Sequence, residues 1–271
     1  MRAALTLCAC VALAACGGAS GGPRDQARAA QAAGAQAELP PLDGSVDHAL
    51  TVELAELLVA HGATDQAVPM LQQALAREPE DARLHYLLGT VLRDRGVFAQ
   101  AEASLREAVR LAPKLAPAWS ALGILHDLRQ AHAEAEAAHR QALALEPTVA
   151  RFHNNLGFCL YLQGRYADAV VAYEEAARRS PNAAQVYTNL GFAYAALGRD
   201  ADAERVFREA GGAASALHNL AVAHELRGDP SKARALYTQA LAADPRLEPA
   251  QRALDALKTS SRPAPPASTS P

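Results

Sequence analysis

Three asparagines occupy the same place in an apolar pattern, each directly before a leucine: Asn155, Asn189 and Asn219. Because a side-chain amide both donates and accepts a hydrogen bond, it can pair with the main chain of a peptide whatever side chains that peptide carries. Aromatic residues follow the first two at helical spacing, at Phe158, Tyr161 and Phe192. These six residues are the candidate peptide-binding site. The alternative is that the amides are solvated or bond locally and that the rings pack between helices.

Patterns typical of catalysis are absent from the sequence. It contains no phosphate-binding Gly-Lys loop, no His-Glu-x-x-His, no Gly-x-Ser-x-Gly and no paired metal-ligand cysteines. We therefore expect a protein that is not an enzyme, uses no cofactor and has no small-molecule substrate. A net charge of -3, with arginines scattered along the chain, argues against a nucleic-acid partner.

Histidines are the remaining candidates for a metal site, since His126, His132 and His139 lie close together in the sequence. Several histidines fall where the repeat described below has a large packing residue: His126, His139, His153 and His224. We interpret them as structural and expect no metal site. Cys159 stands alone in an apolar segment, where a cysteine is most often a small buried hydrophobic residue.

The segments that carry these residues follow an internal repeat. Leu-Gly or Leu-Ala pairs begin at residues 54, 88, 122, 156, 190 and 220, spaced 34, 34, 34, 34 and 30 residues apart. An alanine stands 12 residues after each pair, a larger residue four further on, and a proline closes five of the six units. The clearest unit contains "APAWSALGILHDL". In this register the chain resembles the tetratricopeptide repeat, a helix-turn-helix unit, from about Asp47 to Lys258.

The resemblance implies an all-α fold, a right-handed α-solenoid of six repeats with a capping helix near Glu248 to Lys258. The repeats are placed at 48–81, 82–115, 116–149, 150–183, 184–213 and 214–247. The Gly or Ala beside each leucine would let the two helices of a repeat approach closely.

A second glycine position marks the turn inside each repeat. It lies seven residues after the Leu-Gly or Leu-Ala pair, at Gly62, Gly96, Gly164, Gly198 and Gly228. There a left-handed cap would end the first helix, and because Gln130 takes this place in the third repeat, we expect that turn to be the least favourable. The fifth repeat reads Gly211-Gly212 and the next begins four residues early. We therefore expect a short second helix and an irregular step there.

The resemblance also implies a role for the asparagines. In tetratricopeptide arrays the first helix of each unit lines the concave face, and in several peptide-binding relatives an asparagine ladder at this place holds an extended peptide. Replacing these asparagines should then weaken peptide binding and leave folding almost unchanged. Relatives that clamp a terminal carboxylate carry Lys and Arg on this face, whereas the corresponding residues here are Asn154, Thr188 and His218. A C-terminal carboxylate is therefore not the expected ligand.

The first fifteen residues have the features of a secretory signal, too short to remain as a membrane helix. Leu13-Ala14-Ala15-Cys16 resembles the lipobox of bacterial lipoproteins, in which the cysteine is acylated. The alternative is ordinary cleavage after Ala14. Gly17, rather than Asp, is associated in such families with transport to the outer membrane. Residues 16–47 are predicted to be a flexible tether, and residues 259–271 a disordered Pro/Ser/Thr tail.

A lipobox, a tether and about six repeats together resemble the lipoproteins that assist assembly of type IV and Flp pili. We expect a scaffold anchored in the outer membrane through Cys16 that faces the periplasm, binds proteins or extended peptides, and assists pilus or secretin assembly. Two alternatives stay open, an adaptor for cell-wall enzymes and a periplasmic chaperone for outer-membrane clients.

Overall fold

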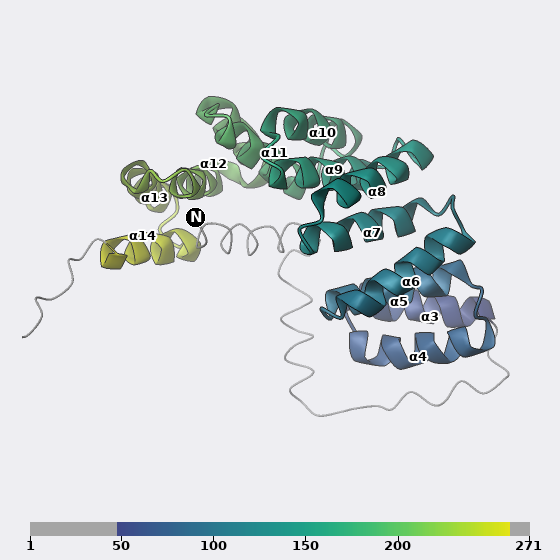
Figure 1. Ribbon diagram of the computed structural model, residues 1–271. Coiled ribbons are helices and arrows are strands. Elements are labelled where there is room, and N and C mark those ends of the chain that lie inside the picture. Colours follow the sequence, from purple (N-terminus) through teal and green to yellow (C-terminus); the bar gives the residue numbers. More distant parts are fainter. Residues whose placement is uncertain (1–47, 261–271) are drawn as a thin grey trace, which may run out of the picture. The chain divides into compact units, whose positions relative to one another are not determined.

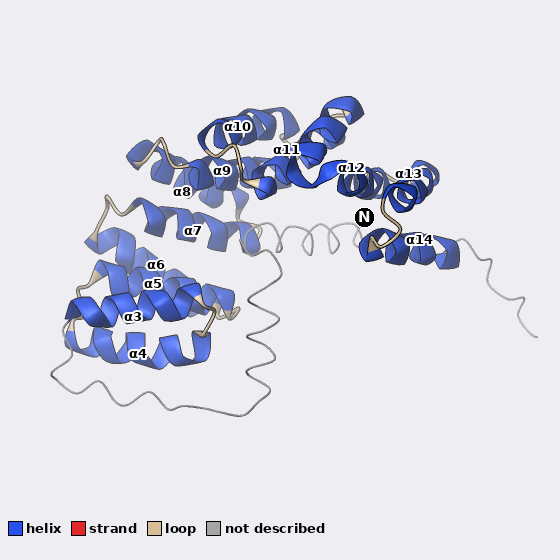
Figure 2. Ribbon diagram, turned by 180° about the vertical axis from the view of Figure 1, so that it is seen from behind, coloured by secondary structure: helices blue, strands red, loops and turns tan. Residues whose placement is uncertain are grey.

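The computed structural model describes residues 48–260, which form α-helices joined by short turns and contain no β-strand (Figures 1 and 2). The described residues belong to two compact units, 48–163 and 164–260. Each unit is a series of helical hairpins, so the predicted all-α class is confirmed. The predicted signal, tether and tail, together with Cys16, lie outside the described residues.

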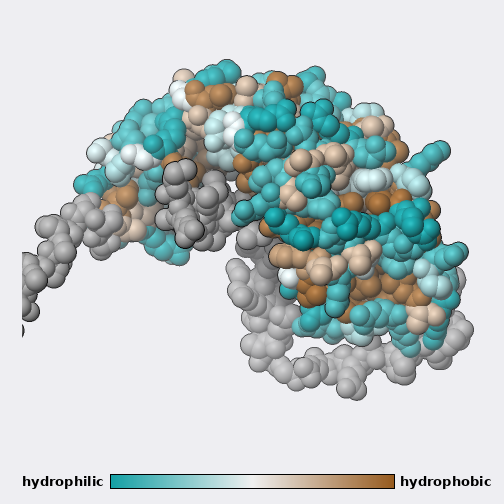
Figure 3. Space-filling view, in the orientation of Figure 1, coloured by the Kyte–Doolittle hydropathy of each residue, from teal (hydrophilic) through white to brown (hydrophobic). Residues whose placement is uncertain are grey.

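The first unit contains seven helices: α3 (His48–Ala60), α4 (Thr64–Arg77), α5 (Ala82–Asp94), α6 (Phe98–Leu111), α7 (Ala116–Leu128), α8 (His132–Leu145) and α9 (Ala150–Leu162). Each helix packs against the next, and α3, α5, α7 and α9 also contact one another in series. These four first helices therefore form one layer, the first-helix layer, while α4, α6 and α8 form the other. Hydrophobic residues show between the helices of this unit, and hydrophilic residues cover much of the surface in view (Figure 3).

The second unit contains α10 (Tyr166–Arg179), α11 (Ala184–Ala196), α12 (Asp200–Leu226), α13 (Pro230–Ala243) and α14 (Glu248–Ser260). Here too each helix packs against the next. The final helix α14 covers α13, with Ala250 and Leu254 buried, as expected of a capping helix.

The Leu-Gly pairs mark the closest approach of two helices, as predicted. A Cβ atom added to Gly123 would lie 2.6 Å from the ring of His139, and one added to Gly191 would lie 2.4 Å from the ring of Phe207. Both rings are buried, with exposed fractions of 1% and 0%. Contacts this short cannot be made by real Cβ atoms without a shift of the ring or the helix, so glycine is what allows each helix pair to close.

Ring N–H groups fix the turns between repeats in the first unit. Trp119 Nε1 donates to the carbonyl oxygen of Pro113 at 2.9 Å. His153 Nε2 donates in the same way to Pro147 at 2.8 Å, and His85 Nε2 to Pro79 at 2.9 Å. Because each acceptor is a carbonyl, the proton lies on Nε2 of both imidazoles. These two histidines therefore make the same turn-closing hydrogen bond as the tryptophan, which supports a structural role for His153.

The turns inside the repeats adopt the left-handed conformation that the glycine pattern predicts. Gly96 has φ +76° and Gly198 has φ +74°. Gln130, in the third repeat, adopts the same conformation with φ +62°, and it is the single residue other than glycine with positive φ among those described. The fold thus imposes this turn even where the side chain opposes it.

The junction after the fifth repeat differs from the others. Helix α12 is interrupted by two residues with non-helical backbone angles, Gly211 (φ -159°, ψ 15°) and Gly212 (φ 81°, ψ -177°). It therefore consists of two helical segments, 200–210 and 213–226 (Figure 1). The first segment is shorter than the 14-residue helices α10 and α13, which confirms the predicted short second helix. The sequence did not predict that one helix would follow the other without a loop.

Within residues 48–260 no helix has both the length and the apolar character needed to cross a membrane.

Replacing Gln130 by Gly tests how strongly the fold imposes this turn. We expect the free energy of unfolding to rise by about 0.5–1 kcal/mol, because glycine adopts positive φ without the steric cost that glutamine has there. Urea unfolding followed by circular dichroism measures the change. A loss of stability would show that the Gln130 side chain stabilises the fold by more than the strain of its positive φ destabilises it.

Candidate functional site

The three candidate asparagines hold one place in their first helices. Asn155 lies on α9 in the first unit, while Asn189 on α11 and Asn219 on the second segment of α12 belong to the second unit. The leucines that follow Asn189 and Asn219 are both 4% exposed. Successive helical residues are about 100° apart, and Asn155 and Asn219 are half-buried at the border of the buried stripe, whereas Asn189 is buried.

Asn155 is bonded to the neighbouring first helix. Its Nδ2 donates to Oγ of Ser120 on α7 at 3.0 Å, and Ser120 is only 4% exposed. The bond joins two helices of the first-helix layer. Part of this amide is therefore structural, as in the alternative of local bonding that the sequence left open.

Asn189 also has a local partner. Its Oδ1 accepts from Nε2 of Gln185 at 3.1 Å, one turn earlier on α11, and the residue is 8% exposed. Asn219 differs, because it is half-buried and its side chain makes no hydrogen bond with any residue of the described part of the chain. Of the three amides, Asn219 is thus the one whose side chain has no hydrogen-bond partner in the described part of the chain.

The aromatic candidates are all half-buried rather than fully exposed. Phe192 on α11 packs edge-on against the buried ring of Phe207, with ring centroids 5.1 Å apart. Part of Phe192 therefore belongs to the core, and the rest extends the surface beside Asn189. Phe158 and Tyr161 lie on α9 of the first unit, where they accompany Asn155.

Three family models match the chain. One model, described as tetratricopeptide repeat, matches residues 52–116 and 89–147. A second model with the same description matches residues 214–247, and a third, described as TPR repeat, matches residues 159–198. Together these matches cover more than half of the 271 residues. The chain belongs to the tetratricopeptide-repeat family. Members of this family are protein-binding scaffolds, and the residues above lie on the first helices of their repeats.

Solved structures with this fold resemble the tetratricopeptide-repeat chain at low sequence identity. PilW, titled a widely conserved type IV pilus biogenesis factor, has a TM-score of 0.64 and 21% identity and covers 76% of this chain and 98% of its own. PilF from Pseudomonas aeruginosa has a TM-score of 0.60 and 21% identity, covering 76% and 95%. YrrB, titled a TPR protein with an unusual peptide-binding site, has a TM-score of 0.51 and 20% identity, covering 68% and 97%.

A search of curated protein sequences gives no match to this tetratricopeptide-repeat chain. The structural likenesses are all below 25% identity, so they show the fold alone.

The places where carboxylate-clamping relatives carry cations are uncharged here. Asn154 is 8% exposed, and Thr188 donates to the Ala184 carbonyl of its own helix at 2.9 Å. Burial lowers the pKa of His218, which keeps its ring neutral near pH 7. These places therefore hold amide, hydroxyl and imidazole groups instead of the cations of a carboxylate clamp.

The histidines of the third repeat are tied to a carboxylate that the sequence analysis did not single out. His139 Nε2 lies 3.0 Å from Asp127 Oδ2, and His132 Nδ1 lies 3.4 Å from Asp127 Oδ1. His126 is buried, which lowers its pKa. In the described part of the chain no three His, Cys, Asp or Glu side chains are arranged to hold a metal ion.

Cys159 is fully buried, and this burial raises the pKa of its thiol, so it is not a reactive thiolate at neutral pH. The interpretation of Cys159 as a small buried residue is confirmed.

Two residues that bond the candidate residues or the histidines were missed by the sequence analysis. Ser120 supports Asn155, yet the third repeat has Ala121 at the asparagine place, so the repeat pattern gave no signal. Asp127 was missed because a carboxylate near the end of a helix is usually solvent-exposed. Its buried partner His139 lies 12 residues further along the chain, so their contact could not be predicted from the sequence.

The Ser120–Asn155 bond predicts a difference among the asparagines. Replacing Asn155 by Ala should lower the free energy of unfolding by about 0.5–1.5 kcal/mol, because buried Ser120 loses its donor. Replacing Asn219 by Ala should change it by less than about 0.5 kcal/mol. Urea unfolding of both variants measures the difference.

A double-mutant cycle with Ser120→Ala provides the control. If the bond exists, the double variant should lose little more stability than either single variant. Fully additive losses would show that the two side chains do not interact.

Proposed function

We propose that the chain is a periplasmic scaffold, held to the outer membrane by an acylated Cys16, whose first helices in the second unit, α11 and the second segment of α12, bind extended, uncharged peptide segments during assembly of a pilus or its secretin. The observation that carries the proposal is the half-buried amide of Asn219, which has no hydrogen-bond partner in the described part of the chain. An amide held by a rigid helix can pair with a peptide main chain at little entropic cost.

The surroundings of Asn219 in the second unit favour a neutral ligand. Asn189 holds the same place on α11, and the half-buried ring of Phe192 lies one turn further along that helix. The neighbouring places hold Thr188 and the neutral ring of His218. A strongly charged peptide would lose solvation here without gaining a counter-charge.

The pilus role is supported by the structural likeness to PilW, a type IV pilus biogenesis factor by its title, and to PilF. Both cover about three quarters of this chain and nearly all of their own. The lipobox-like Leu13-Ala14-Ala15-Cys16 supports the anchor. The acyl chains that such a cysteine carries would hold the scaffold at the bilayer.

Peptide binding is tested with the full-length protein and a dodecapeptide selected from a random phage library. Asn219→Ala should weaken binding by about 2- to 12-fold, which corresponds to a lost hydrogen bond of about 0.5–1.5 kcal/mol. Fluorescence anisotropy of the labelled peptide measures the affinity. Asn182→Ala is the matched control, since Asn182 is an exposed asparagine in the turn between α10 and α11. Equal affinities of the wild type and the Asn219 variant would contradict the proposed site.

The anchor is tested separately by fractionating cells that express the full chain. Cys16→Ser should move the protein from the membrane fraction to the soluble periplasm, because the acylated thiol is lost. Cys10→Ser, which lies inside the predicted signal, should leave it in the membrane. Persistence of the Cys16 variant in the membrane would refute lipid anchoring and leave peptide binding untouched.

A further inference from the structure

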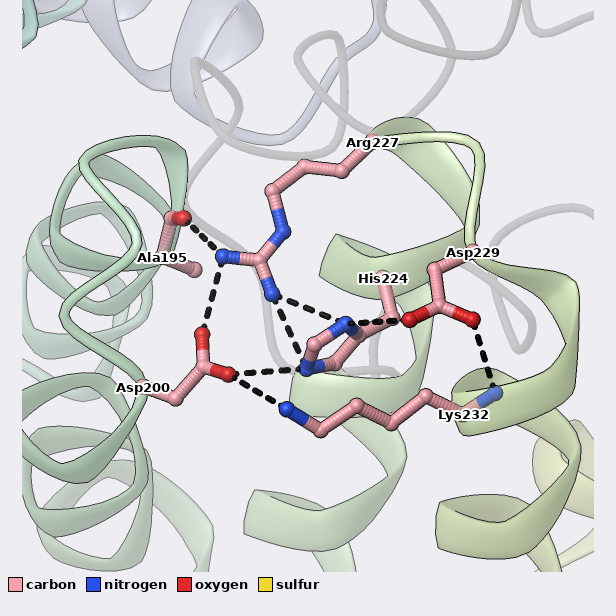
Figure 4. Close-up of polar contacts among 6 residues, drawn as sticks. All are labelled: Ala195, Asp200, His224, Arg227, Asp229 and Lys232. Atoms are coloured by element: carbon pink, nitrogen blue, oxygen red, sulfur yellow. Dashed lines mark hydrogen bonds and ion pairs between the residues drawn. The ribbon is translucent and has the colours of Figure 1, made fainter.

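A cluster of charged side chains and one histidine joins four helix ends in the second unit. It consists of Asp200, His224, Arg227, Asp229 and Lys232, and we refer to it as the joint cluster (Figure 4). Asp200 begins α12, His224 and Arg227 lie at its end, and Asp229 and Lys232 lie at the start of α13. The carbonyl of Ala195, near the end of α11, completes it.

Arg227 and Asp200 form the centre of the joint cluster. Arg227 Nη1 donates to the Ala195 carbonyl at 2.6 Å and lies 2.9 Å from Asp200 Oδ1. Lys232 Nζ lies 2.9 Å from Asp200 Oδ2. Burial by itself would raise the pKa of Asp200, but the hydrogen bonds from Arg227 and Lys232 outweigh it and lower the pKa to about 2. Asp200 is therefore ionised throughout the physiological range.

His224 is enclosed by these charges, with its side chain only 4% exposed. Its Nε2 lies 3.0 Å from Asp200 Oδ2, and its Nδ1 lies 3.9 Å from Asp229 Oδ2. Arg227 Nη2 lies 2.8 Å from Nδ1 and 2.9 Å from Nε2. A neutral imidazole with its proton on Nε2 donates to Asp200 and accepts from Arg227 at Nδ1, the nearer of its two ring nitrogens to Arg227 Nη2.

The joint cluster lies at the opposite end of α12 from the Gly211-Gly212 interruption. The segment 200–210 is about 15 Å long at 1.5 Å per residue, and its first residue meets residues at the end of the segment 213–226. The two segments therefore fold back on one another as a hairpin. The glycine pair forms its closed end, and the joint cluster holds the open end together.

The first unit shows what is particular to this joint. Arg95 and Arg129 occupy the place of Arg227 in their repeats and pair with Asp65 and Glu102 of the preceding repeat. Both arginines are well exposed, with side-chain exposures of 40% and 44% against 26% for Arg227. In the third repeat the buried His126 holds the place of His224 and lies near Glu102 and Arg129, but its ring makes no hydrogen bond to either side chain in the described part of the chain. The joint between the fifth and sixth repeats differs because its buried histidine contacts the carboxylate and the arginine directly.

We propose that the joint cluster is a proton-operated latch that holds the fifth and sixth repeats at a fixed angle about the Gly211-Gly212 hinge. Protonation of His224 turns Nδ1 from an acceptor into a donor, so Arg227 loses this partner and meets a second positive charge. Lys232 adds to that repulsion, while Asp200 and Asp229 oppose it. Displacement of Arg227 then removes its bond to the Ala195 carbonyl, and the open end of the hairpin loosens.

The direction of the pH effect follows from the surroundings of His224. Burial, and then the charge of Arg227, lower its pKa below the ordinary value of 6.5. The unfolded chain therefore binds this proton at a higher pH than the folded chain does. The contribution of the latch to stability is complete above pH 6.5 and is lost as the pH falls through the lowered value.

Hydrogen-deuterium exchange of the full-length protein tests the latch, with peptides from residues 193–231 as the readout and peptides of the first unit as the internal reference. In the wild type, exchange at the joint, corrected for the intrinsic rate, should rise several-fold between pH 7.5 and pH 5. His224→Gln should abolish this rise, because an amide can donate to Asp200 and accept from Arg227 without titrating. Arg227→Ala should show fast exchange at both pH values.

Arg95→Ala is the matched control, because it removes the equivalent exposed pair in the first unit and should leave exchange at the joint unchanged. An equal pH response of the wild type and His224→Gln would overturn the proton-operated latch. Slow exchange of Arg227→Ala at pH 7.5 would show that the joint cluster does not hold the hairpin closed. Neither readout depends on a bound peptide, so the result is independent of the proposed function.

Discussion

Close packing of a glycine against a large side chain of the partner helix is the constraint on which the rest of the molecule depends. Gly123 faces the ring of His139, and Gly191 faces the ring of Phe207, in each case with no room for a Cβ atom. This contact sets the distance between the two helices of a repeat. It also fixes the rotation of each first helix, because the leucine beside the glycine must enter the core. The residue before that leucine is half-buried at Asn155 and Asn219 and buried at Asn189.

Most of the fold could be predicted from the sequence because this constraint leaves a periodic trace. Each helical hairpin needs the same residues at its turn and at its end, and the hairpin is repeated along the chain. This need produces the 34-residue spacing, the glycine at the turns and the proline between repeats. Even the exception at Gln130 obeys the rule, since its backbone takes the positive φ of the glycines. A repeat that packs on its neighbours determines the conformation of a turn more strongly than the residue at the turn does.

The details of the candidate site could not be predicted, because they depend on pairs of residues that the periodicity does not relate. Asn155 bonds Ser120, 35 residues away, and the repeat spacing pairs it with Ala121 instead. The three asparagines look equivalent in sequence, yet only Asn219 keeps its amide without a partner in the described part of the chain. The joint cluster was missed for a related reason, since its five side chains come from helix ends that meet only after α12 folds back at Gly211-Gly212.

The account makes the surface around Asn219, on α11 and the second segment of α12, the binding surface, and the structure of a complex tests this most directly. A crystal structure of the full-length protein with a selected dodecapeptide should show an extended peptide whose main-chain groups lie within hydrogen-bond distance of the Asn219 amide, beside Phe192. A peptide seated on α10 and α13, or on α11 and α12 with Asn219 turned away from it, would contradict the account.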